Sequence, residues 1–97
     1  MVTLPPKDRE PKRSEIRQVL VWLIDETITA EEADEWATNW IINDRLLRVY
    51  DTAVWDLLLD LAGSDMQTAP GEYLFDTETY KNWLKEFDQK TQADAEK

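Results

Sequence analysis

The sequence predicts an all-α protein: a small four-helix bundle with a disordered or extended N-terminal arm and a C-terminal tail. The length of 97 residues suits one domain with a modest core. Apolar residues recur at helical spacing in four segments, and several of these segments begin with residues that cap helices. We therefore expect a flexible arm over residues 1–13, a helical domain over 14–88 and a flexible tail over 89–97.

The first predicted helix runs from about Ser14 to Asp25, with Ser14 as its N-cap. Its apolar residues cover most of the circumference of a helix. Within it, Val19 to Ile24 form a short apolar run rich in β-branched side chains, which also fits a buried strand. The cap and the length favour a helix, and the strand stays open as an alternative.

The second predicted helix has the clearest start, a capping box with Thr29 at the N-cap and Glu32 three residues later. It extends to about Ile42. Tryptophan and aliphatic residues recur along it at helical spacing, so one face should be buried. That stripe consists of Ala33, Trp36, Ala37, Trp40 and Ile41.

The third predicted helix runs from about Thr52 to Ala62, after an extended connection over residues 46–50. Asp51 or Thr52 can cap it, and Gly63 follows it at a position where helices commonly end. Apolar residues cover more than half of its circumference. We therefore expect this helix to be central in the bundle.

The last predicted helix runs from about Thr77 to Asp88 and follows the longest loop, residues 64–75. A Pro70–Gly71 pair marks a turn within that loop. Aromatic residues at helical spacing should face the core from this helix.

The composition excludes most catalytic chemistry. Without cysteine there is no disulfide, cysteine-bound zinc or thiol catalysis. Without histidine, the usual general base and the commonest metal ligand are absent. Two glycines are too few for a phosphate-binding glycine loop. We therefore expect no enzyme activity, no cofactor and no metal site.

The hydropathy pattern argues against a membrane association. The longest apolar run, residues 19–24, is too short to span a bilayer. The first residues lack the apolar segment of a signal peptide. We expect a cytoplasmic protein.

The charge is strongly negative and unevenly distributed. The net charge is −10, from 21 acidic and 11 basic residues. Two stretches, residues 25–35 and 49–80, contain acids and no base. Such a body should repel phosphates, so we expect no direct contact with nucleic acid. It should attract a basic protein, although a net charge that only maintains solubility is the simpler interpretation.

The acids of the second and third helices are the candidate contact surface for a basic partner. Asp56 and Asp60 lie one helical turn apart, where like charges cost about 0.2–0.5 kcal/mol. No base on the same helix can offset that cost. The candidate partner-binding residues are Glu31, Glu32, Asp34, Glu35, Asp56 and Asp60.

The layout of residues 15–87 resembles the small acidic helical immunity proteins of bacterial toxin–immunity pairs, including the colicin D immunity type and those of contact-dependent growth inhibition. The resemblance rests on an apolar first helix, the Ile28–Thr29–Ala30–Glu31–Glu32 helix start, an acidic second helix and an aromatic last helix. It implies a protein that binds and neutralises a cognate toxin domain with a basic surface, often a nuclease. We expect the protein to be a monomer when free.

Two other functions remain open. One is a phage-type inhibitor or nucleic-acid mimic that blocks a basic host protein. The other is a helical adaptor that forms homodimers through apolar residues off the core-facing stripes, namely Val21, Trp22 or Ile42.

Overall fold

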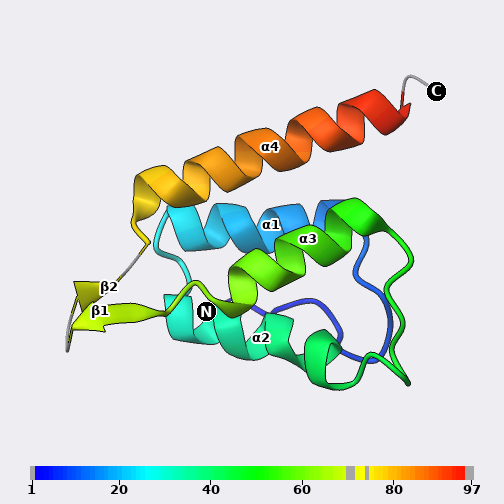
Figure 1. Ribbon diagram of the computed structural model, residues 1–97, viewed down its shortest axis with the longest axis horizontal. Helices are drawn as coiled ribbons and strands as arrows, with labels where there is room; N and C mark the ends of the chain where they lie inside the picture. Colours follow the sequence, from blue (N-terminus) through cyan, green and yellow to red (C-terminus); the bar gives the residue numbers. More distant parts are fainter. Residues whose placement is uncertain (1, 70–71, 74, 96–97) are drawn as a thin grey trace.

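The described residues fold into four helices and a short hairpin, so the predicted all-α bundle is confirmed (Figure 1). The computed structural model describes residues 2–69, 72–73 and 75–95. The elements in chain order are α1 (Arg13–Ile24), α2 (Ala30–Ile42), α3 (Thr52–Ala62), β1 (Gln67–Ala69), β2 (Glu72–Tyr73) and α4 (Thr77–Ala95).

The helices run alternately in opposite directions along the long axis of the molecule (Figure 1). The α1–α3 pair lies in the middle, with α2 on one side and α4 on the other. Within the described part of the chain, α2 and α4 are the one pair of helices whose backbones do not pack side by side. One end of the molecule therefore gathers the starts of α1 and α3 and the ends of α2 and α4 (Figure 1).

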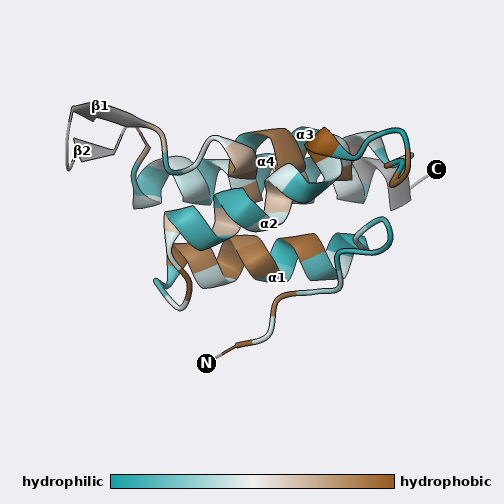
Figure 2. Cartoon of the chain, turned by 90° about the horizontal axis from the view of Figure 1, so that it is seen from below, coloured by the Kyte–Doolittle hydropathy of each residue, from teal (hydrophilic) through white to brown (hydrophobic). Residues whose placement is uncertain are grey.

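The core is built on the apolar stripes that the sequence predicts. The tryptophans of the α2 stripe, Trp36 and Trp40, are fully buried, with ring centroids 4.5 Å apart in an edge-on arrangement. The apolar run Val19 to Ile24 is helical, which settles the alternative of a strand. Figure 2 shows that α1 is mostly hydrophobic over its second half and mixed over its first half.

The N-terminal arm lies along α2. The indole N–H of Trp36 donates to the carbonyl oxygen of Pro5 at 3.0 Å, and that of Trp40 to the carbonyl oxygen of Arg9 at 2.8 Å. Between them, the amide of Asn39 donates to the carbonyl oxygen of Lys7 at 2.9 Å. The expected flexibility of the arm stays a prediction, as does the division into arm, domain and tail.

An ion pair fastens the arm to α1. The guanidinium of Arg9 donates to both carboxylate oxygens of Glu15, at 2.7 and 2.8 Å. The same carboxylate accepts the N–H of Lys12 at 2.8 Å. Hydrogen bonding to Arg9 is the main cause that lowers the pKa of Glu15 to about 2.

Two helix bounds differ from the prediction. The N-cap of α1 is Lys12 rather than Ser14, because the side chain of Glu15 satisfies the N–H of Lys12. At the other terminus, α4 continues to Ala95 instead of ending near Asp88. Residues 89–95 contain neither glycine nor proline, so nothing in them stops the helix.

The loop after α3 contains a small antiparallel hairpin, in which Gln67 pairs with Tyr73 and Ala69 with Glu72. The predicted turn at Pro70–Gly71 lies outside the described residues. Ser64 fixes the start of the loop, since its carbonyl oxygen accepts the hydroxyl of Tyr80 at 2.9 Å. None of the described helices combines the length and the apolar composition of a membrane-spanning segment.

The link between α1 and α2 forces Glu26 into the left-handed region, at a φ of 65°. The N–H groups of Glu26 and Thr27 donate to the carbonyl oxygens of Leu23 and Trp22, the pairing of a Schellman motif. Glycine normally fills this position, because a side chain there costs about 1–2 kcal/mol.

Replacing Glu26 by glycine should therefore stabilise the protein. We expect E26G to raise the free energy of unfolding by about 1 kcal/mol, the relief of backbone strain less the entropy of a new glycine. Urea denaturation measures this. The control E26Q removes the charge but keeps the strain, and equal stability of E26G and E26Q would contradict the assignment.

Replacing Glu15 by glutamine should destabilise the protein only where the carboxylate is charged. Because its folded pKa lies below the usual 4.5, its contribution is present above about pH 4.5 and is lost as the pH falls toward 2. Urea denaturation should show the deficit of E15Q at pH 7 shrinking as the pH falls through that window. E35Q is the control, and a deficit independent of pH would contradict the role of the ion pair.

Candidate functional site

The six acids chosen from the sequence do not form one surface. Glu31, Glu32 and Glu35 are exposed on the first half of α2, and Asp34 beside them is half-buried. The two α3 acids, Asp56 and Asp60, instead line a small groove between α3 and α4. No residue of α2 lines this groove. Their role in binding a partner stays a prediction. The acids of α2 and those of α3 form two separate groups.

One of the two α3 acids forms an ion pair within the protein. Lys90 of α4 donates to Oδ2 of Asp56 at 3.3 Å. Burial raises the pKa of Asp60, and the nearby Glu86 raises it further while Lys90 opposes the shift. The groove therefore holds three carboxylates and one ammonium group, and the sequence of α3 alone does not reveal the pairing of Lys90 with Asp56.

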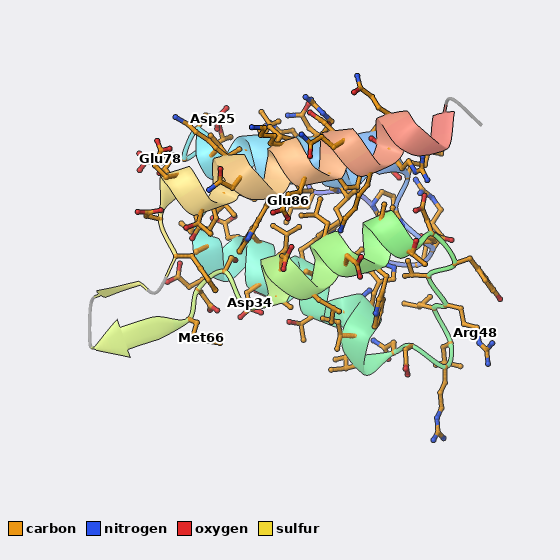
Figure 3. The ribbon with its side chains drawn as sticks, turned by 45° about the horizontal axis from the view of Figure 1, so that its top comes forward. Asp25, Asp34, Arg48, Met66, Glu78 and Glu86 are labelled. Atoms are coloured by element: carbon orange, nitrogen blue, oxygen red, sulfur yellow. The ribbon has the colours of Figure 1, made fainter. Side chains whose placement is uncertain are left out.

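Nine of the described acidic residues gather at one end of the molecule, where α1 and α3 end and α2 and α4 begin. Figure 3 shows Asp25 and Glu78 close to that end. Burial raises the pKa of Asp65, and the neighbouring carboxylates of Asp34 and Glu31 add to the shift. We call this set the acidic pole: Asp25, Glu26, Glu31, Glu32, Asp34, Glu35, Asp65, Asp76 and Glu78.

The opposite end carries the bases of the arm and of α1, largely matched by acids. Nε of Arg13 donates to Asp51 at 2.6 Å, which joins the starts of α1 and α3. Nε of Arg17 donates to Asp88 of α4 at 2.9 Å. These pairs hold the bundle together at this end and leave little excess charge on α1.

The connection from α2 to α3, residues 43–50, carries two further bases, and we call it the basic loop. Its arginines, Arg45 and Arg48, are exposed and form no ion pair with any described residue. Figure 3 shows Arg48 pointing away from the bundle. Leu46 and Tyr50 are exposed over 84% and 78% of their surface.

A shallow groove of about 340 Å³ runs along the basic loop. It is lined by Asp44, Arg45, Arg48, Val49, Tyr50 and Trp55. Arginines beside accessible aromatic rings are typical of surfaces that bind nucleic acids. The sequence does show two arginines separated and followed by apolar residues over 45–50, but the expected extended connection gave no reason to single this segment out.

No group of three carboxylates among residues 2–69, 72–73 and 75–95 is arranged to hold a metal ion. The absence of enzyme activity and of a cofactor stays a prediction.

A family model described as "YxzC DNA-binding protein" matches residues 8–87. The chain belongs to this family. A relative from Bacillus subtilis strain 168, named "Uncharacterized protein YxzC", is 34% identical over 59 residues, which cover 61% of this chain and 48% of the relative. The chain thus spans about half the length of this curated relative. No solved structure matches the chain.

The family assignment corrects the functional prediction. The resemblance to toxin immunity proteins is wrong, and so is the cognate toxin as partner, because the matching family is described as DNA-binding. The alternatives of a nucleic-acid mimic and of a homodimerising adaptor are not supported either. The exclusion of direct contact with nucleic acid conflicts with the same description and is also wrong.

Contact with nucleic acid was wrongly excluded because the prediction relied on the net charge of the whole chain. A capping box and an acidic helix report where a helix begins and which face is solvated, and many unrelated proteins share them. Phosphates respond to the local potential at the surface they touch. The acidic pole dominates the sum, while the basic loop lies at the other end of the bundle.

Proposed function

We propose that this protein binds DNA through the basic loop at the end of the bundle opposite the acidic pole. The observation that carries the proposal is the pair Arg45 and Arg48, which are exposed and have no ion-pair partner among the described residues. Such arginines donate well to phosphate oxygens. The description of the family supports the same function.

Distance within the molecule reduces the repulsion expected from the acidic pole. The two ends are separated by the length of α2, whose 13 residues span about 20 Å. The Debye length at physiological ionic strength is about 8 Å, so exposed charges two or more such lengths away are largely screened. DNA held at the basic loop would therefore meet a small fraction of the total negative charge.

The acidic pole would also orient the complex. It repels phosphates at close range, so a DNA strand approaching that end is disfavoured and contact at the basic loop is selected. The proposal includes binding without catalysis and a cytoplasmic location.

Removing both arginines should weaken binding and flatten its dependence on salt. For R45Q/R48Q we expect the slope of log affinity against log salt concentration to fall in magnitude by about 2, one unit for each lost phosphate contact. Fluorescence anisotropy with labelled DNA over a salt series measures both quantities.

The matched control is K81Q/K85Q, which removes the same charge from exposed lysines of α4. It should leave the slope unchanged. If both double variants weaken binding equally, only net charge matters and the basic loop is not the interface. If the wild-type protein binds no DNA at low salt, the proposal fails altogether.

A further inference from the structure

We infer that the DNA bound by the basic loop is single-stranded, with a base stacked on Tyr50 in the loop groove. This inference rests on the proposed function and narrows it to one class of DNA. It depends on three features of the loop: the exposed ring, the groove beside it and the two arginines along the same groove.

The ring of Tyr50 is available for stacking. It is exposed over 78% of its surface and has no hydrogen bond or ring contact with any described residue. Leaving an aromatic ring this exposed forgoes the stabilisation that its burial would give. A ring in this state is suited to a ligand that covers its face.

The groove places a second aromatic side chain and both cations beside that ring. Trp55, which packs partly against the core from α3, forms another part of the wall. Since Trp55 is anchored in a helix, this side of the groove is rigid. Arg45 and Arg48 line the same groove, so phosphates flanking a stacked base would meet a guanidinium.

A duplex offers little to such a groove. Its base faces are stacked on one another, and the grooves present only base edges. Reading those edges usually requires a helix that lies in the major groove, close to the phosphates of both strands. The exposed positions of α2 and α3 instead carry carboxylates, among them Glu31, Glu35 and Asp56. A single strand exposes its base faces and needs only the loop.

The test compares a labelled oligothymidine with a blunt duplex of the same length, using the full chain. We expect tighter binding of the single strand. Y50L removes the ring but keeps an apolar side chain, and it should weaken single-strand binding at least fivefold, the lower end for a lost base stack. Y50F keeps the ring and should bind like the wild-type protein.

M66A is the control, because Met66 is an exposed apolar residue outside the basic loop, and it should leave both affinities unchanged. Tryptophan fluorescence gives an independent readout: oligothymidine should quench the wild-type protein, and W55F should lose part of that quenching. The conservative change to phenylalanine keeps the packing of residue 55 against the core.

The outcomes separate this inference from the proposed function. If the duplex binds as tightly as the single strand, or if Y50L binds the single strand like the wild-type protein, the stacking inference is overturned. In that case binding that is still sensitive to R45Q/R48Q retains the proposed function. If neither form of DNA binds, both are overturned.

Discussion

The structure depends on two buried indole N–H groups that need acceptors. Trp36 and Trp40 lie on the stripe of α2 that faces the core, and an unpaired buried N–H costs about 1–3 kcal/mol. Backbone carbonyls of the arm, at Pro5 and Arg9, accept both hydrogen bonds. The arm must therefore follow α2 toward its C-terminal end, and this path brings Arg9 and the start of α1 to the end that carries the basic loop.

Chain topology then separates the charges. Because successive helices run in opposite directions, the ends of α1 and α3 meet the starts of α2 and α4 at one end of the molecule. The acids near these helix termini form the acidic pole. Toward the other end, three acids pair with arginines of the arm and α1, as in the pair Arg13–Asp51. What remains is a molecule with a net charge of −10 whose α2–α3 connection is locally basic.

The sequence predicts the helices well and the site poorly, for physical reasons. The starts of α2 and α3 follow from local capping by Thr29 and Asp51. In the structure, the side chains of these two residues accept hydrogen bonds from the backbone N–H groups of Glu32 and Ala53. The arm could not be placed, because its acceptors are backbone carbonyls that carry no side-chain signature. The basic loop was missed because exposure and the lack of an ion-pair partner at Arg45 and Arg48 are properties of the tertiary structure.

Backbone amide chemical shifts during a titration with oligothymidine test the central claim, that DNA meets the basic end and avoids the acidic pole. The account predicts perturbations concentrated in the basic loop, residues 43–50, and extending to the first turn of α3. It predicts none at residues 25–35 or 76–81. Perturbations centred on the acidic pole, or spread evenly over the bundle, would contradict it.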